Sequence, residues 1–166
     1  MGYNASFERL PVSACFDLKG EEVALVEWIG AGVLPEFPVE ANCCRKADGV
    51  SLDHVGPRHW LLQANIDRED ALNAALRPHD APAEVSIVRI SDTLTTFRIT
   101  GTDAAHVLAI GCPLDLHEAA FPEDAVSFAE LFGQNALVRR CAGGFDVSVE
   151  QSFGDMMEDC LTRALR

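Results

Sequence analysis

The sequence predicts an α+β fold, an antiparallel-rich sheet with three helices in a ferredoxin-like arrangement. Apolar residues recur with a period of two in several short runs, which is typical of half-buried strands, and with a helical period in three other segments. Pairs of strands alternate with single helices, which argues against a doubly wound parallel sheet. The expected order contains a strand–helix–strand element twice, as ferredoxin-like folds do.

The length of 166 residues suits one domain, because domains commonly contain about 100 to 200 residues. Residues 1–20 show no clear periodicity and are expected to form an N-terminal arm. Residues 21–166 are expected to form the single domain.

Short apolar runs bounded by Gly, Pro, Ser or Asp mark the expected strands. These runs cover 22–29, 50–54, 59–64, 84–90, 95–100, 126–131, 136–141 and 145–149. The runs 84–90 and 95–100 are separated by Ser91 and Asp92, so they are expected to pair as a hairpin.

Two helices are expected in the middle of the chain. The first covers 67–77, with Asp67 as its cap and Pro78 after its last turn. The second begins after Gly101 and ends at Gly111, which is expected to adopt the left-handed conformation of a helix C-terminus.

The third helix follows a cap at Ser152 and has the clearest periodicity in the chain. Its apolar residues follow the i, i+3, i+4, i+7, i+8 spacing of an amphipathic helix. They are Phe153, Met156, Met157, Cys160, Leu161, Ala164 and Leu165.

The chain is acidic, with 26 Asp and Glu against 13 Lys and Arg, a formal net charge of −13. No cluster of Lys and Arg could replace the counterions of a nucleic acid, and an anionic membrane surface is disfavoured on the same ground. No apolar run approaches the roughly 20 residues of a membrane helix. Two readings of the charge remain, namely solubility and steering toward a partner with a basic face.

The N-terminus shows no basic segment followed by an apolar stretch, so a cytoplasmic location with reduced thiols is expected. None of the six cysteines forms a C-x-x-C pair. The vicinal pair Cys43 and Cys44 could bind a soft metal or respond to redox change, or it could be inert. His54 and His59 lack companion donors at metal-ligand spacing, so no metal site is expected.

No glycine-rich phosphate loop and no G-x-S-x-G turn occurs, so no nucleotide cofactor and no catalytic residue are expected in this chain. Cys112 could pair with His117 as nucleophile and base. It also follows a helix, where the dipole would raise its pKa, and packing at a turn is the leading alternative. Arg139 and Arg140 place one guanidinium on each face of a strand, one of them toward the covered side or a partner.

Three motifs together resemble the gamma subunit of heterotetrameric sarcosine oxidase. They are Gly-Pro-x-x-Trp-Leu-Leu at 56–62, Phe-Arg-Ile-Thr-Gly-x-x-Ala-x-x-Val-Leu at 97–108, and Gly-Cys-Pro-Leu-Asp-Leu-His at 111–117. The resemblance spans about residues 56–162. It implies a fold like the folate-binding domain of the glycine-cleavage aminomethyltransferase family.

The resemblance also implies partners, namely the alpha, beta and delta subunits of a complex that oxidises the N-methyl group of sarcosine. Such complexes use FAD, FMN and NAD and pass the one-carbon unit to tetrahydrofolate, with these cofactors mainly in the larger subunits. The chain is therefore expected to be an accessory, non-catalytic subunit. Aromatic residues and ordered turns favour interfaces, so the candidate partner contacts are Trp60, Cys112, Pro113, Leu114, Asp115, His117 and Phe121.

An apolar interface left without its partner favours self-association of the isolated chain. The alternative function is a free-standing small-ligand protein of the same fold, of folate-binding type, which an Arg and an acidic residue in one pocket would favour. A third hypothesis is an enzyme that depends on Cys112.

Overall fold

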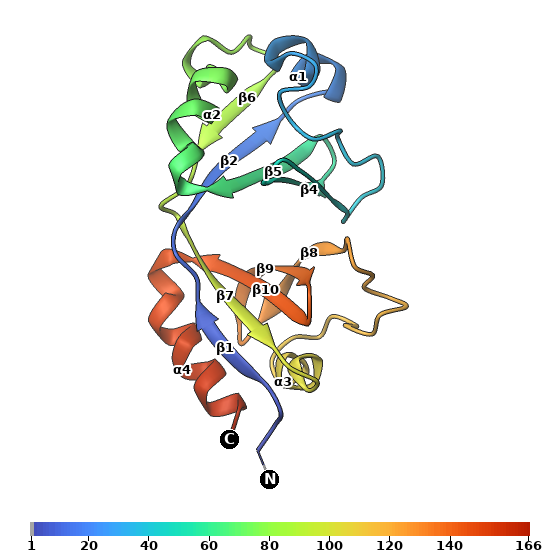
Figure 1. Ribbon diagram of the computed structural model, residues 1–166, viewed down its shortest axis with the longest axis vertical. Coiled ribbons are helices and arrows are strands. Elements are labelled where there is room, and N and C mark those ends of the chain that lie inside the picture. The colour runs from blue at the N-terminus through green and yellow to red at the C-terminus, as the bar shows by residue number, and fades with distance from the viewer. Residues whose placement is uncertain (1) are drawn as a thin grey trace. The chain divides into compact units, whose positions relative to one another are not determined.

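The backbone passes twice between two units, each with its own sheet and its own hydrophobic core. The computed structural model describes residues 2–166 (Figure 1). Unit 1 comprises the chain up to Pro11 together with Asp92–Arg166, and unit 2 comprises Val12–Ser91. Where we expected one domain over 21–166, unit 2 is inserted whole between the first and second strands of unit 1.

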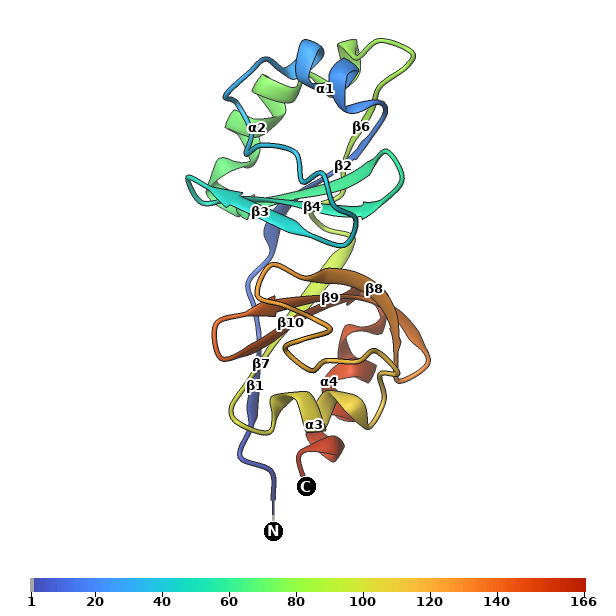
Figure 2. The same cartoon turned by 90° about the vertical axis from the view of Figure 1, so that its right-hand side faces the viewer.

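Unit 2 is a layer of two helices on a five-stranded antiparallel sheet. The sheet order is β3 (Cys44–Ala47), β4 (Val50–Gly56), β5 (His59–Asn65), β2 (Ser13–Lys19) and β6 (Ser86–Arg89). The helices α1 (Glu22–Ile29) and α2 (Glu69–Leu76) cover one face of this sheet (Figure 2). The 3₁₀ turns η1 (Ile66–Arg68) and η2 (Pro78–Asp80) flank α2.

Unit 1 repeats this layering. Its sheet order is β1 (Ser6–Arg9), β7 (Leu94–Thr100), β10 (Gly144–Glu150), β9 (Gln134–Cys141) and β8 (Val126–Leu131), again antiparallel. The helices α3 (Ala104–Ala109) and α4 (Gly154–Ala164) lie on one side of the sheet (Figure 2), and η3 (Gln151–Phe153) leads into α4.

The two units share one topology. Unit 2 runs β2, α1, β3, β4, β5, α2, β6, and unit 1 runs β7, α3, β8, β9, β10, α4, with β1 in the sheet position that β6 holds in unit 2. This is the ferredoxin-like order with one added edge strand in each unit. The tight turns correspond as well, because Asp48 and Gly49 (φ 50° and 73°) match Phe132 and Gly133 (φ 49° and 81°). Positive φ at both central residues is the type I′ hairpin geometry.

A glycine ends the first strand of each topological repeat. Gly20 has a φ of 145° and Gly101 has a φ of 121°. A Cβ at Gly20 would lie 2.9 Å from the carbonyl oxygen of Glu84, and one at Gly101 would lie 2.3 Å from that of Asn4. Only glycine combines this conformation with so close an approach of a neighbouring backbone, and in both units that backbone leads into the outer strand, β6 or β1.

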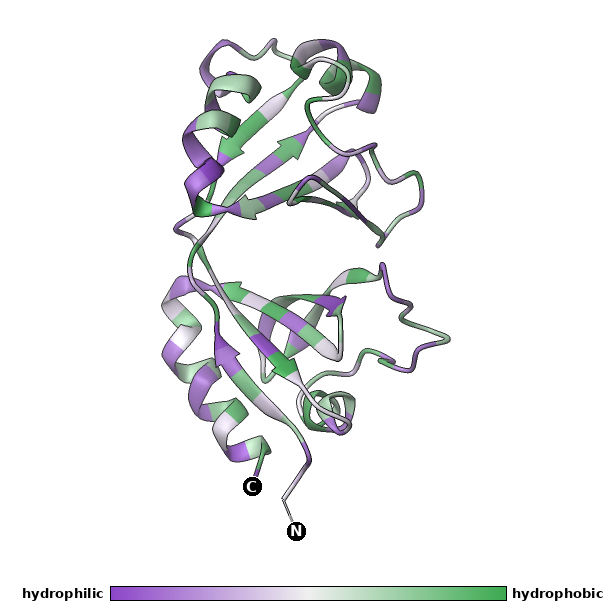
Figure 3. Ribbon diagram, viewed as in Figure 1, coloured by the Kyte–Doolittle hydropathy of each residue, from purple (hydrophilic) through white to green (hydrophobic). Residues whose placement is uncertain are grey.

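The α+β class, the antiparallel sheets and most of the elements expected from the sequence are confirmed. Strands β4, β5, β8, β9 and β10 and helices α2, α3 and α4 lie where the periodicity predicts them. In α4 the residues Met157, Leu161 and Ala164 are buried, and Figure 3 shows hydrophobic and hydrophilic residues alternating along this helix.

The expected N-terminal arm is wrong. Residues 6–9 form β1, and 13–19 form β2, which pairs with both β5 and β6 inside its sheet. Ala14, Phe16 and Leu18 alternate into the core of unit 2. The pattern was hidden because Cys15, between them, is also buried.

The expected strand at 22–29 is also wrong, since these residues form α1. Residues 2–166 therefore contain four α-helices where three were expected. Leu25 and Ile29, four residues apart, are buried, while Val23 and Glu27 are exposed. That spacing is helical, but an eight-residue apolar run does not distinguish a buried strand from a short helix by periodicity.

The expected hairpin between 84–90 and 95–100 does not form, because β6 pairs with β2 in unit 2 while β7 pairs with β1 and β10 in unit 1. Ser91 ends unit 2 instead, with its hydroxyl accepting a hydrogen bond from the Cys15 N–H at 3.0 Å.

Three helix-end assignments differ from the structure. The side chain of Asn65, not Asp67, caps the first helical turn by accepting from the Asp67 N–H at 3.0 Å. Ser152 lies within η3 and makes no capping hydrogen bond. Gly111 has no positive φ; its role is steric, because a Cβ there would lie 2.2 Å from the Phe132 ring.

Replacement of Gly101 by alanine is expected to lower the free energy of unfolding by about 2 to 3 kcal/mol, since strain and a backbone collision act together. Gly133→Ala is the matched control, because Gly133 has a φ of 81° but nothing within 4 Å of a built Cβ. It should cost about 1 kcal/mol. Urea unfolding followed by circular dichroism measures both, and equal losses would contradict the collision at Gly101.

Candidate partner-contact site

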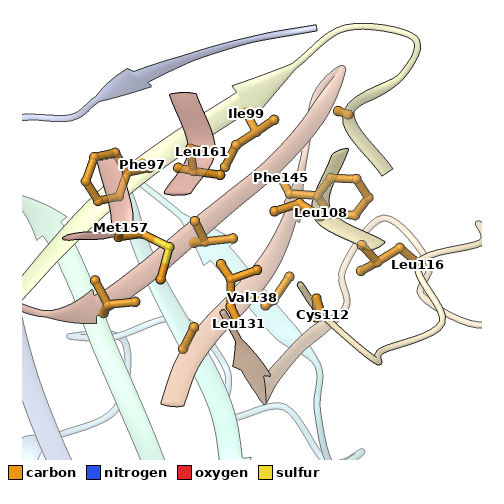
Figure 4. Close-up of a cluster of buried hydrophobic side chains, with 14 of the residues drawn as sticks. Phe97, Ile99, Leu108, Cys112, Leu116, Leu131, Val138, Phe145, Met157 and Leu161 are labelled. Carbon is orange, nitrogen blue, oxygen red and sulfur yellow. The ribbon is translucent and has the colours of Figure 1, made fainter. Parts of the chain in front are cut away.

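The segment between α3 and β8 contains most of the predicted contact residues and is called here the 112–121 loop. Cys112, Leu116 and Phe121 anchor it, with exposed fractions of 5%, 6% and 4%. Figure 4 shows Cys112 and Leu116 among the apolar side chains of the unit 1 core. The loop is therefore held at its start, middle and end.

Arg140 on β9 fastens the same loop. Its Nε donates to the carbonyl oxygen of Phe121 at 2.5 Å and its Nη2 donates to that of Leu116 at 2.6 Å, while its backbone N–H donates to Ala125 at 3.0 Å. The guanidinium lies 4.7 Å from the ring centroid of Phe145, a cation–π contact. Of the two adjacent arginines, Arg140 is thus the one on the helix-covered face.

The exposed part of the 112–121 loop is ordered by its own side chains. The Asp115 carboxylate accepts the His117 N–H at 2.9 Å, and the His117 Nδ1 accepts the Ala119 N–H at 3.2 Å. Pro113, Asp115 and His117 are exposed and Leu114 is half-buried. A surface that is already ordered loses less conformational entropy when it binds a partner.

Three of the seven predicted contact residues are not on the surface. The side chains of Cys112 and Phe121 belong to the core of unit 1, and Trp60 is 3% exposed in the core of unit 2. The aromatic character that suggested an interface reflects core packing instead. Pro113, Leu114, Asp115 and His117 remain available for contact.

Trp60 organises the corresponding loop of unit 2. Its ring is perpendicular to that of Phe37 (5.0 Å, 86°) and stacked on that of His54 (5.1 Å, 22°). The His54 Nδ1 donates to the carbonyl oxygen of Glu40 at 3.0 Å, and the His54 N–H donates to Cys43 at 2.9 Å. His54 therefore corresponds to Arg140 of unit 1, since each contacts an aromatic ring and binds a carbonyl oxygen of the loop that follows the first helix.

The matching role of His54 and Arg140 was missed at the level of sequence. Each lies in a strand directly opposite an aromatic residue of the next strand, as the pairs His54–Trp60 and Arg140–Phe145 show. A polar residue paired in register with a buried aromatic is the signal that could have identified both.

Cys112 packs in the core of unit 1 at the turn after α3. Burial raises the pKa of the Cys112 thiol, and a backbone hydrogen bond at Leu114 offsets this only in part. The His117 Nδ1 is engaged by the Ala119 N–H. A protonated, buried thiol is a poor nucleophile.

On the sheet face of unit 1 away from its helices, Glu8, Arg98, Asp146 and Arg139 are neighbours in one row across four strands, with alternating charge. Arg98 binds the Asp146 carboxylate through two hydrogen bonds of 2.7 and 2.8 Å, and these raise the pKa of the guanidinium. Burial and the same carboxylate raise the pKa of Cys141. Such cross-strand pairs stabilise the sheet register.

Within residues 2–166, no group of three or more His, Cys, Asp or Glu side chains is placed to hold a metal ion. Cys43 is half-buried and Cys44 is buried. The His59 Nε2 lies 2.5 Å from an Asp17 carboxylate oxygen.

No helix within residues 2–166 has the length and apolar character needed to cross a membrane.

Two pockets, one in each unit, are large enough for an organic ligand. The α1 pocket of unit 2, between α1 and residues 30–39, has a volume of about 490 Å³. A pocket of about 440 Å³ in unit 1 is lined by residues of β8, β9, β10 and η3, among them Phe128 and Glu150. Neither pocket contains an arginine, so neither has the pairing of Arg with an acidic residue that would favour a folate-type ligand.

Replacing Arg140 with lysine is expected to loosen the 112–121 loop, since an ammonium group cannot hold two carbonyl oxygens in the fork geometry of a guanidinium. The loss of charged hydrogen bonds should cost about 1.5 to 3 kcal/mol. Amide hydrogen exchange at Ala120 and Phe121 should accelerate, whereas Arg163→Lys on the exposed face of α4 should leave it unchanged. Unaltered exchange in the Arg140 variant would show that the core anchors alone hold the loop.

The Cys112 thiol is expected to resist alkylation by iodoacetamide in the folded chain at neutral pH, because only the thiolate reacts and burial disfavours it. Peptide mass spectrometry after brief labelling should find Cys112 unmodified and the half-buried Cys160 modified. Both should react in denaturant. Rapid native labelling of Cys112 would revive the nucleophile hypothesis.

The fold of the chain is similar to that of two solved proteins. No protein-family model matches the chain, and no curated protein matches its sequence. A chain of the heterotetrameric sarcosine oxidase from Corynebacterium sp. U-96, solved with pyrrole 2-carboxylate, superposes with a TM-score of 0.81 at 21% identity, over 97% of this chain and 83% of that chain. The glycine cleavage system aminomethyltransferase T from Bartonella henselae superposes with a TM-score of 0.69 at 14% identity.

The second match covers 95% of this chain but only 45% of the aminomethyltransferase, so the present chain spans less than half of that enzyme. At these identities the likeness establishes the fold alone. The α+β fold of the chain is the one found in these two proteins of sarcosine oxidation and glycine cleavage.

Proposed function

We propose that the chain is an accessory, non-catalytic subunit of a sarcosine oxidase-type complex, in the position of the gamma subunit. The observation that carries the proposal is the reciprocal coverage of the sarcosine oxidase match, 97% of this chain against 83% of its neighbour. The neighbour chain is thus close to this one in extent, whereas the aminomethyltransferase is more than twice as long as the matched region.

The chemistry of the described residues agrees with a binding role. The one candidate nucleophile, Cys112, is buried with a raised pKa, and the sequence has no nucleotide-binding glycine loop. In the proposed complex, FAD, FMN, NAD and tetrahydrofolate are bound by the alpha, beta and delta subunits in the cytoplasm. This chain would supply a preformed surface, with Pro113, Asp115 and His117 at its exposed tip.

A free-standing folate-binding protein is the alternative, and the aminomethyltransferase fold favours it. The charge of the α1 pocket and of the unit 1 pocket does not favour it. Folates carry carboxylates, and the α1 pocket presents Glu22 and Glu36 while the unit 1 pocket presents Glu150, without an arginine in either. A dicarboxylate would meet like charge at both places.

Affinity capture of the tagged full-length chain from its native host is expected to recover a partner with visible flavin absorbance. Asp115→Ala and His117→Ala should each reduce that recovery, because both side chains order the exposed tip of the 112–121 loop. His106→Ala, an exposed histidine of α3, is the matched control and should not.

Recovery of the chain only as a lone monomer would argue strongly against the complex. Titration of the isolated chain with tetrahydrofolate separates the alternative, since submicromolar binding would favour a free-standing ligand protein over an accessory subunit.

A further inference from the structure

The α1 pocket is open and mainly apolar. Val26 and Ile29 of α1 form one side, and Leu34, Phe37 and Val39 of the following loop form the other. Its volume of about 490 Å³ lies in the range of pockets that accept organic ligands or side chains of a binding partner, about 300 to 1,000 Å³. Val39 is 86% exposed, so its side chain is accessible to a binding partner.

The loop that forms the pocket is held by fewer contacts than its counterpart in unit 1. The 112–121 loop places three side chains in its core, and Arg140 binds two of its carbonyl oxygens. In unit 2 the histidine that replaces the arginine binds a single carbonyl, that of Glu40. Within the described chain, backbone hydrogen bonds hold Gly30 and Asn42, and none holds residues 31–39.

The charge at the pocket has one sign. Glu22 and Glu36 line it, no Lys, Arg or His does, and neither carboxylate forms an ion pair within residues 2–166. The nearby Glu21, by contrast, is paired with Arg58 at 2.8 Å. Together with the net charge of −13, this potential repels anions and attracts a cation that is attached to an apolar group.

We propose that the α1 pocket is a docking site for an apolar segment of a partner protein that carries lysine or arginine beside its apolar side chains. The apolar side chains enter between α1 and residues 34–39, and the basic groups pair with Glu22 and Glu36. The role of this partner as a subunit of the complex rests on the proposed function, but the pocket's preference for a basic apolar segment does not.

The first test uses a rhodamine-labelled synthetic peptide with lysines separated by pairs of leucines, titrated into the full-length chain by fluorescence anisotropy. Binding should weaken about threefold to tenfold in a Glu22→Gln, Glu36→Gln double variant. Glu27→Gln, on α1 but outside the pocket, should bind as the unaltered chain does. Peptides with glutamate for lysine, or serine for leucine, should not bind.

The second test addresses the apolar wall. Val39→Asp should abolish peptide binding, while Val23→Asp, also exposed on α1 but outside the pocket, should not. Neither side chain belongs to the core, so both variants keep the fold. Hydrogen exchange should show protection at residues 22–39 when the lysine–leucine peptide is bound.

The proposal is overturned if the peptide does not bind, if it protects another region, or if Val39→Asp and the double variant bind it unchanged. Flavin recovery from the native host separates this failure from failure of the proposed function. A flavin partner that is recovered although the peptide does not bind refutes the pocket but not the complex. Peptide binding without any flavin partner refutes the complex but not the pocket.

Discussion

Unit 1 depends on the pairing of β1 with β7, in which Ser6 lies opposite Thr100. The whole of unit 2 lies between these two strands in the sequence. Without β1 the sheet would end at β7 and expose one edge of that strand. Several contacts converge on this pairing. Gly101 allows the backbone of Asn4 to approach, the Asn4 N–H donates to Asp103 at 2.7 Å, and Arg9 reaches α4 through Asp155 at 3.0 Å. These contacts fix the residues on either side of β1 to α3 and α4.

The two units share one topology but hold the loop after the first helix by different side chains. In each, a polar residue stacks on an aromatic ring of the next strand and binds the loop that follows the first helix. Arg140 has a permanent charge and several donors, so it holds two carbonyl oxygens and closes its loop onto the core. His54 holds one, and the loop of unit 2 retains an open pocket. The closed loop presents an ordered polar tip, and the open loop presents apolar surface with acidic side chains.

Sequence periodicity predicted the elements whose buried and exposed residues alternate cleanly, such as β10 and α4. It failed for β2 and α1, where burial on both sides or a short apolar run removes the alternation. The loop anchors follow from pairings between distant segments, which periodicity does not contain. The contact role of Asp115 and His117 stays a prediction. The burial of Trp60 and Cys112 depends on tertiary packing, which loop composition does not contain.

The ends of unit 2 lie side by side, because Cys15 on β2 exchanges hydrogen bonds with Ile90 and Ser91 at the end of the unit. Closing a chain into a loop costs entropy that grows with the length of the loop. Once the inserted unit has folded, it acts as a short rigid connection, and β1 and β7 meet at a much smaller entropic cost. During synthesis on the ribosome, the insert can therefore mature first while the initial strand waits for its partner. Damage to β2 or β6 should then slow the assembly of a unit to which neither strand belongs.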